Sequence, residues 1–216
     1  MIANRKLKDA RYVGFSTVGK VFSNSRRLEL LDILIQRPHS VDELATNLQQ
    51  SVASTSQHLQ VLKRAKVVVT KRKGTTIIYS LAEGTLEVFV ALRALAENIS
   101  SDLQMLHQQS DLPTVGFEYV QHILKYSSAI LLDVRTKSEF AHRHMEGAIN
   151  IPLSDLLSRY TELSISKPLI VTCRGPYCVS SDEAAHLLEQ KGFAVSRYDD
   201  GVGEWCVQGG DLCGPI

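Results

Sequence analysis

The sequence predicts two domains: a mainly α domain with a β-hairpin over residues 1–110, and an α/β domain with a parallel sheet over residues 111–216. Three observations support this prediction. The chain has 216 residues, enough for two domains of about 100 residues each. Apolar residues follow helical spacing in the first half, whereas short apolar strands alternate with helices in the second. Charge also divides between the halves.

The charge asymmetry bears on the partners of each half. Residues 1–110 hold 15 basic and 9 acidic residues, a net of +6, and residues 111–216 hold 9 and 14, a net of −5, which together give the overall +1. A basic half joined to an acidic half suggests that only the first half meets a polyanion. Chance explains the asymmetry equally well when it is taken by itself. The hydrophobic content of 44% is ordinary for a globular protein and argues against disorder.

The compartment follows from what the sequence lacks. No apolar run approaches the roughly 20 residues that span a bilayer, and the basic N-terminus has no apolar core of a secretory signal. We therefore expect a cytoplasmic protein that does not bind a membrane. The cysteines are Cys173, Cys178, Cys206 and Cys213. We expect mostly reduced thiols and no disulfide framework.

Three helices are expected early in the first half. The first covers residues 24–36 and ends before Pro38. The second covers residues 40–48 and begins with a capping box that Glu43 completes. The third covers residues 51–65.

After the third helix the period of the apolar residues changes. The β-branched runs Val67–Lys71 and Thr76–Leu81 predict a hairpin with a basic tip. A long helix over Thr85–Gln108 follows, with apolar residues every three or four positions. The pattern breaks around Asp111–Pro113, where we place the linker.

The second half alternates strands and helices. Strands are expected at Ala129–Val134, Pro168–Thr172 and Ala194–Tyr198. Helices are expected near Phe117–Lys125, Ser138–His144, Ser154–Glu162 and Ser180–Gln190. Such alternation predicts a parallel sheet with both faces covered.

Two short helices joined by a tight turn and followed by a basic hairpin are the parts of a winged helix-turn-helix. Small polar groups at the N-terminal end of the second of these helices can meet base edges in the major groove. Basic groups at its other end and in the wing would engage phosphates. The residues predicted to bind DNA are Ser54, Thr55, Ser56, Gln57, His58, Lys63, Arg64, Lys71, Arg72 and Lys73.

The stretch 40–81, with its S-x-H-L-x-x-L core and its Gly74 wing, resembles the ArsR/SmtB family of winged-helix repressors. The resemblance extends over roughly residues 20–108. It implies a homodimer that represses by binding two-fold operator DNA. Much of the dimer interface would lie on the helix Thr85–Gln108, although a purely intramolecular role of that helix is the alternative.

Some positions depart from the family pattern. Gln49 stands in the helix–helix turn and Lys66 before the wing, where glycine is usual; other residues adopt such turns at modest cost. Many relatives sense metals or arsenite through a Cys-x-Cys pair in the helix that here reads Val41–Leu48, which contains no cysteine. Because soft metals select thiolates, we expect no thiolate sensor in this half. His58 is expected to pack or contact backbone, and no metal site or cofactor is predicted.

Cys173 directly follows the predicted strand Pro168–Thr172, and a helix begins at about Ser180. Gly175 and Pro176 can turn the loop between these elements. Backbone N–H groups and the positive end of the helix dipole would lower the pKa of a thiol here and stabilise a thiolate nucleophile. On this geometry, a buried structural cysteine is an equal alternative.

The stretches LLDVRTKSEFAHRHMEGAINIP and DDGVGEW resemble the signatures of rhodanese-like domains, over about residues 114–216. The resemblance implies that Cys173 carries sulfane sulfur and that thiosulfate or a persulfide is a ligand or substrate. The loop that would shape the pocket comprises Arg174, Gly175, Pro176, Tyr177, Cys178 and Val179. Asp133 and Arg135 are interpreted as structural. Phosphate-ester chemistry is disfavoured because it requires arginine where Val179 stands.

Two residues beside the nucleophile suggest more specific roles. Arg174 is expected to attract an anionic substrate. One hypothesis for Cys178 is that it attacks the sulfur loaded on Cys173, giving a disulfide or a sulfur-bridged pair. Simple packing of Cys178 is an equal alternative. Cys206 and Cys213 receive no role.

Together these features predict a DNA-binding regulator whose rhodanese-like half carries or senses sulfane sulfur on Cys173. The alternative is a sulfurtransferase that moves sulfur from thiosulfate or a persulfide to a thiol acceptor, with the winged helix used for dimerisation or targeting. A third hypothesis makes the second half a catalytically silent binding module.

Overall fold

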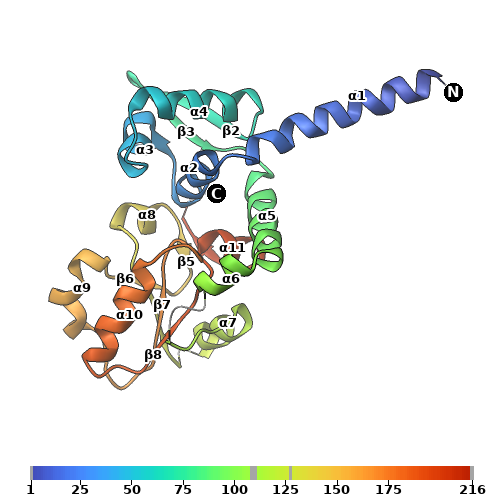
Figure 1. The fold of residues 1–216 in the computed structure, drawn as a ribbon. Helices are drawn as coiled ribbons and strands as arrows, with labels where there is room; N and C mark the ends of the chain where they lie inside the picture. Colours follow the sequence, from blue (N-terminus) through green and yellow to red (C-terminus); the bar gives the residue numbers. More distant parts are fainter. Residues whose placement is uncertain (1, 108–110, 127, 215–216) are drawn as a thin grey trace. The chain divides into compact units, whose positions relative to one another are not determined.

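The computed structural model describes residues 2–107, 111–126 and 128–214, apart from the side chains of residues 2–4, 104, 106 and 107. The chain forms two compact units, Met1–Phe89 and Val90–Ile216, which Figure 1 shows in sequence colours. These units meet inside the helix α5 (Thr85–Ile99). The domains proposed from the sequence, 1–110 and 111–216, meet after that helix.

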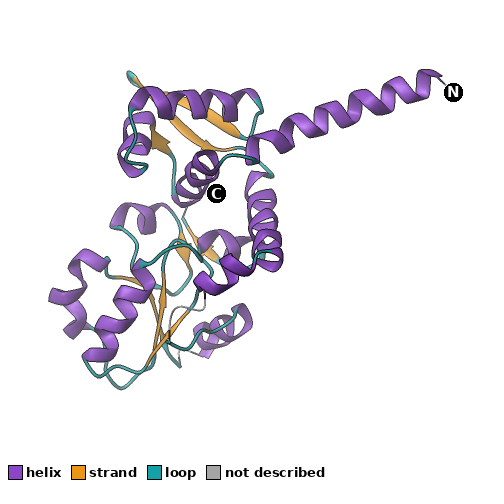
Figure 2. Cartoon of the chain, in the orientation of Figure 1, coloured by secondary structure: helices purple, strands orange, loops and turns teal. Residues whose placement is uncertain are grey.

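The first unit combines helices with one small antiparallel sheet (Figure 2). Its central helices are α2 (Ser25–Gln36), α3 (Val41–Asn47) and α4 (Val52–Arg64). Its strands are β1 (His39–Ser40), β2 (Val68–Lys73) and β3 (Thr76–Leu81), in the order β1-β3-β2. Apolar side chains from the helices, including Leu30, Leu44 and Leu62, are buried against Val68 and Tyr79 of the sheet. The helices and the hairpin predicted from the sequence are confirmed.

Side chains close the N-terminal ends of all three helices. The side chain of Asn24 accepts a hydrogen bond from Arg27 N–H, and that of Ser51 accepts one from Ser54 N–H. Ser40 and Glu43 form the predicted capping box. Each cap satisfies backbone N–H groups that have no partner within the helix, so these starts are encoded locally.

Gln49 and Lys66 adopt left-handed backbone conformations, with φ of 52° and 60°. After α3, Gln49 N–H donates to Thr46 O and Gln50 N–H to Ala45 O. This pair of bonds is the Schellman arrangement that usually places glycine at the left-handed position. Lys66 ends α4 in the same way. The two departures from the family pattern therefore retain the glycine-type turn.

The wing is a tighter hairpin than predicted. Lys73 pairs with Thr76, so only Gly74, with φ of 61°, and Thr75 form the turn. Arg72 and Lys73 lie in β2 and not in the loop. The β-branched residues of β3 extend the ladder to the turn because each finds a backbone partner on β2.

Two helical segments differ from the prediction. The N-terminal helix α1 (Ile2–Gly19), followed by a short 3-10 turn (Lys20–Phe22), was not predicted. The predicted helix Thr85–Gln108 is divided into α5 and α6 (Ser101–His107); Gln108 lies outside the described residues. Ser100 causes the division, because its hydroxyl accepts a hydrogen bond from Leu103 N–H and begins a new helix.

The second unit contains the predicted parallel sheet, which has four strands where three were expected; the unexpected strand is β6 (Ile149–Asn150). Its strands are β4 (Ile130–Asp133), β6 (Ile149–Asn150), β7 (Leu169–Thr172) and β8 (Val195–Arg197), in the order β6-β4-β7-β8. A short antiparallel pair, β5 (His144–Met145) and β9 (Leu212–Cys213), lies outside this sheet.

Helices cover both faces of the parallel sheet (Figure 1). They are α7 (Phe117–Tyr126), α9 (Leu153–Arg159), α10 (Ser180–Gln190) and α11 (Val202–Val207). Helix α8 (Lys137–His142) follows β4 and contacts β5. Leu132 and Val171 pack with residues of α9 and α10. Leu131 and Ile170 face the other way and pack with residues of α7 and α11. Because successive side chains of a strand point to opposite faces of the sheet, the same strands contribute apolar residues to the cores on both faces.

The ends of two helices in the second unit differ slightly from the sequence prediction. Helix α8 ends at His142, and His144 instead begins β5. Helix α9 ends at Arg159, after which Tyr160–Glu162 form a 3-10 turn. No helix among the described residues has the length and apolar character needed to cross a membrane.

The left-handed turn after α3 leads to a stability prediction. Gln49→Gly should stabilise the first unit by about 0.5–1 kcal/mol, because removing Cβ relieves the left-handed strain and outweighs the entropy lost by glycine. Amide hydrogen exchange of α3 and α4 measures this change. The control Gln50→Gly, at an adjacent position without positive φ, should instead lose about 0.5–1 kcal/mol. Faster exchange in both variants would show that the turn is unstrained.

Candidate functional site

The carboxyl end of β7 carries Cys173 into the loop that precedes α10. Cys173 is 3% exposed and belongs to the core beneath α10. Val179 occupies the N-cap position of α10 without a side-chain cap, so no side chain at this position satisfies the first N–H groups of the helix. Groups of this kind favour negative charge on a nearby sulfur.

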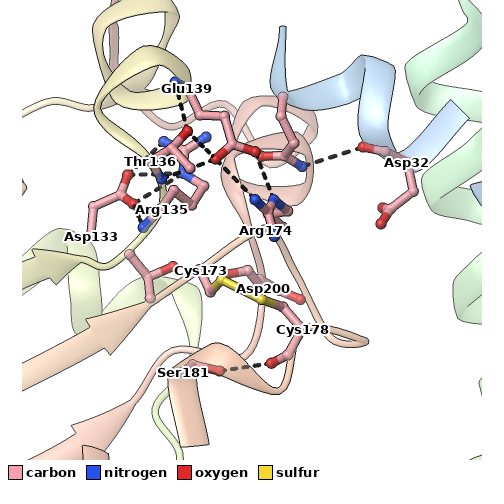
Figure 3. The surroundings of a disulfide bond; sticks show 12 residues. Asp32, Asp133, Arg135, Thr136, Glu139, Cys173, Arg174, Cys178, Ser181 and Asp200 are labelled. Atoms are coloured by element: carbon pink, nitrogen blue, oxygen red, sulfur yellow. Dashed lines mark hydrogen bonds and ion pairs between the residues drawn. A yellow bond between two sulfur atoms is a disulfide. The ribbon is translucent and has the colours of Figure 1, made fainter. Parts of the chain in front are cut away.

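Cys173 and Cys178 are joined by a disulfide, with 6.3 Å between their Cα atoms (Figure 3). Cys178 N–H donates to Gly175 O at 3.0 Å, which folds the loop back on itself. The Ser181 hydroxyl donates to Cys178 O at 3.1 Å and ties the loop to the first turn of α10. The loop therefore brings the two predicted sulfur residues into bonding contact.

The other loop residues lie around this disulfide at different depths. Gly175 is buried, with φ of 143°, a conformation that favours glycine. Pro176 is half-buried, whereas Tyr177 and Val179 are 50% and 68% exposed. The residues predicted to shape a pocket thus differ in exposure, from buried Gly175 to exposed Tyr177 and Val179.

Arg174 forms an ion pair with Glu139, which was not among the predicted site residues. Its Nε lies 2.6 Å from Glu139 Oε1 and its second terminal nitrogen 3.1 Å from Oε2 (Figure 3). Glu139 is buried, while the side chain of Arg174 is 38% exposed. Thr136 completes the arrangement through a capping box with Glu139 at the start of α8. Glu139 therefore positions Arg174 and offsets its charge.

The pKa of Glu139 reflects this arrangement. Burial by itself raises the pKa of this carboxyl group, but hydrogen bonds and charge from Arg174, together with hydrogen bonds from Thr136, hold it below its ordinary value. The carboxylate thus stays ionised at neutral pH. It holds Arg174, the residue that directly follows Cys173.

A second ion pair supports the carboxyl end of β4. Asp133 and Arg135 are both 1% exposed, and a terminal nitrogen of Arg135 lies 2.5 Å from Asp133 Oδ2. The same nitrogen donates to Arg143 O at 2.9 Å. The Asn150 amide donates to the backbone carbonyls of both Asp133 and Arg135. These contacts match the structural role interpreted from the sequence.

The glycine of the DDGVGEW stretch permits a close backbone approach. A Cβ placed on Gly201 would lie 2.1 Å from Arg174 O, so only glycine fits beside the loop. Gly201 also begins α11, where Glu204 accepts its N–H at 3.0 Å. The turn after β8 and the loop after β7 are therefore packed backbone to backbone.

In the first unit, α4 presents a polar surface with one predicted residue turned inward. Thr55 is fully buried, and its hydroxyl donates to Ser51 O at 3.0 Å. Ser54, Ser56 and His58 are half-buried. Gln57 is exposed, as are three further polar or basic positions of the helix. These three are Gln60, Lys63 and Arg64, of which Gln60 was absent from the predicted set.

The wing carries the remaining predicted residues. Lys71, Arg72 and Lys73 are all exposed on β2. Arg72 Nε donates to Gly74 O at 3.0 Å, which folds its side chain over the turn. A cluster of cations on a thin hairpin suits contact with a phosphate backbone. Among the described residues, no group of His, Cys, Asp and Glu side chains is arranged to hold a metal ion.

Comparison with known proteins supports the predicted domain type of each half of the chain. A model of the arsR family of bacterial regulatory proteins matches residues 24–69, and a rhodanese-like domain model matches residues 117–208. The HTH-type transcriptional regulator Rv0324 of Mycobacterium tuberculosis is 33% identical over 201 residues, covering 89% of this chain and 87% of that protein. The chain belongs to the arsR family of HTH-type transcriptional regulators. It is a DNA-binding regulator with a rhodanese-like domain, as the sequence predicted.

Further similarities cover single domains of this ArsR-family regulator. The uncharacterized protein YqhL of Bacillus subtilis is 37% identical over 101 residues, covering 42% of this chain and 79% of that protein. The solution structure of the homodimeric winged helix-turn-helix domain of Mb0332 from Mycobacterium bovis is 33% identical, with a TM-score of 0.41. That alignment covers 43% of this chain and 88% of the domain.

The exposure of α4 yields a prediction for DNA readout. Gln57→Ala should weaken specific DNA binding by about 1–3 kcal/mol and relax the preference at one base pair, because an exposed amide can read a base edge. Fluorescence anisotropy with promoter DNA and single-base variants measures both effects. Thr55→Val is the matched control, since the Thr55 hydroxyl is engaged inside the unit. A change of base preference in Thr55→Val, with none in Gln57→Ala, would contradict this assignment.

The Glu139–Arg174 pair yields a stability prediction. A double-mutant cycle of Glu139→Gln and Arg174→Gln should give a coupling energy of about 1 kcal/mol, a modest figure because Arg174 is partly exposed. Urea unfolding followed by tryptophan fluorescence isolates the second unit, because Trp205 is the one tryptophan of the chain and is 2% exposed.

The exposed pair Lys137–Asp155 supplies the control cycle. Its coupling energy should stay below about 0.5 kcal/mol. Equal coupling in the two cycles would mean that Glu139 does not position Arg174.

Proposed function

We propose that this regulator is a repressor whose affinity for operator DNA falls when sulfane sulfur reaches Cys173. The observation that carries the proposal is the bonded pair Cys173–Cys178 in the loop before α10. Residues 1–110 contain no cysteine, so a thiol-based response must come from the second half. The proposal assigns the DNA-contacting role to α4 and the wing, and the sensing role to the sulfur loop.

The proposed chemistry has two steps that balance. The Cys173 thiolate attacks the outer sulfur of a small persulfide, which leaves a Cys173 persulfide and releases the donor's thiol. The Cys178 thiolate then attacks the inner sulfur on Cys173, forming the disulfide and expelling hydrosulfide. The sulfane sulfur is reduced to sulfide while the two cysteines are oxidised. No other oxidant is required.

The loop geometry favours this closure over transfer to an external acceptor. Cys178 is held near Cys173 by the Cys178 N–H to Gly175 O bond and by the Ser181 hydroxyl. An internal thiol at such close range has a large kinetic advantage over a thiol in solution. Sulfurtransferase turnover is therefore the second candidate function, and it requires that an acceptor compete with Cys178.

We further propose that the regulator binds DNA as a homodimer. Helix α5 exposes Val88, Leu95 and Ile99, which share one face. Helix α1 exposes Leu7, Phe15 and Val18 at helical spacing, and Figure 1 shows that it projects from the rest of the first unit. Apolar faces of this kind are typical of subunit interfaces. A two-fold dimer would present two copies of α4 to a two-fold operator.

The test is DNA binding at fixed salt before and after treatment with a low-molecular-weight persulfide. Treatment should weaken binding of the wild type to its own promoter DNA at least tenfold, or about 1.4 kcal/mol. Cys173→Ser should not respond. Cys178→Ser should retain one added sulfur on Cys173 without forming the disulfide, as mass spectrometry of the intact protein would show.

An unchanged DNA affinity after treatment would contradict the proposal. If the treated wild type binds DNA as tightly as the untreated protein, this persulfide does not control DNA binding through Cys173. Multiple turnovers with thiosulfate and a thiol acceptor would then make sulfur transfer the leading function.

A further inference from the structure

Arg93 of α5 is a buried charge that the sites above do not use. Its side chain is 5% exposed and forms an ion pair with Glu204 of α11, which is 6% exposed. Both residues belong to the unit Val90–Ile216. Burial of two charges is costly unless each remains paired, so any displacement of one partner carries a large penalty. The pair is therefore sensitive to movement of its surroundings.

The surroundings of this ion pair include the sulfur loop. A Cβ placed on Gly175 would lie 3.4 Å from an Arg93 terminal nitrogen and 3.4 Å from Glu204 Oε2. The Arg93 guanidinium also lies 5.6 Å from the centre of the Tyr177 ring, a cation–π distance. Gly175 and Tyr177 both lie between the two cysteines. Arg93 thus contacts the segment whose ends the disulfide joins.

Glu204 connects the pair to the other side of the loop. Its Oε2 accepts the Gly201 N–H, and Gly201 is packed against the Arg174 carbonyl. The loop is therefore held between Arg93 and the start of α11.

Helix α5 is one continuous helix shared by the two compact units. Its first residues, Thr85–Phe89, belong to the first unit. The Thr85 hydroxyl donates to Val67 O beside β2, and Phe89 is buried in the first core. Arg93 follows Phe89 by about one helical turn. A force on Arg93 therefore acts on a helix that is anchored in the DNA-binding core.

We propose that Arg93 is the positioning residue through which the state of the Cys173–Cys178 pair biases α5 and, with it, DNA binding. The inference rests on the proposed function. With the disulfide formed, Gly175 and Tyr177 are held against Arg93. With two thiols, the loop is held only by its hydrogen bonds, so Gly175 and Tyr177 can move away from Arg93. The two states thus differ in their interactions with α5, as a switch requires.

The test compares full-length wild type with Arg93→Gln in anisotropy titrations of promoter DNA. Each protein is measured as the dithiol and after closure with a low-molecular-weight persulfide. The wild-type dissociation constants should differ at least tenfold between the two states, and those of Arg93→Gln less than twofold. Mass spectrometry should show the same disulfide yield in both proteins.

The outcomes separate this inference from the function on which it rests. A tenfold response retained by Arg93→Gln, with normal disulfide formation, would overturn the role of Arg93 and leave the sulfur switch intact. If the wild type binds DNA with the same affinity with and without the disulfide, both the role of Arg93 and the proposed sulfur switch are wrong.

Two variants guard against a trivial loss of structure. Glu204→Gln keeps an oxygen for the Gly201 N–H but removes the charge, and it should abolish the response as Arg93→Gln does. Arg159→Gln, which breaks an exposed ion pair with Glu162, should keep the full tenfold response. A Glu204→Gln protein with the full response would contradict the proposal.

Thermodynamic linkage between DNA binding and disulfide formation gives an independent test of the role of Arg93. Because coupling is reciprocal, promoter DNA should shift the thiol–disulfide equilibrium of wild type by the same tenfold factor, about 30 mV for two electrons. In Arg93→Gln, DNA should leave this equilibrium unchanged. A DNA-dependent shift of wild-type size in Arg93→Gln would again overturn the inference.

Discussion

The buried pair of Asp133 and Arg135 is the contact on which the second unit's site is built. Arg135 reaches from the end of β4 to the carbonyl of Arg143, and Asn150 donates to the backbone of both partners. Thr136 follows immediately and caps α8, which places Glu139 beside Arg174. A charge buried at a strand end must be paired. That requirement fixes the position of the strand end and of α8, against which the loop that begins at Cys173 is held.

The first unit depends on helix ends more than on long-range polar contacts. Asn24, Ser40 and Ser51 each close the start of a helix, and left-handed residues close the ends of α3 and α4. These short helices have little intrinsic stability. Their caps and their buried leucines together fix the direction of α4 relative to the wing within this unit. The same local rules thus determine both the fold and the surface that we propose faces DNA.

The sequence predicts best what is encoded locally. The capping box at Ser40, the strand before Cys173 and the parallel sheet follow from neighbouring residues. The break at Ser100 was missed because apolar spacing continues through it. The burial of Thr55 was missed because its polar side chain was assigned to the DNA-binding set, although it lies one helical turn before Leu59 on the buried side of α4. The site contacts were harder still. Glu139 and Arg174 are 35 residues apart, and Arg93 and Glu204 are farther apart still in the sequence.

The unequal burial of the two bonded cysteines has a consequence for the reduction of their disulfide. Cys173 is 3% exposed, whereas Cys178 is only half-buried. A small thiol would therefore reach Cys178 first, form a mixed disulfide there and release Cys173 as the thiolate. The nucleophile is restored before its partner. In the proposed switch, the duration of the response would depend on how fast reductant reaches Cys178, so DNA binding would recover only after this reduction and not as soon as the sulfur donor is gone.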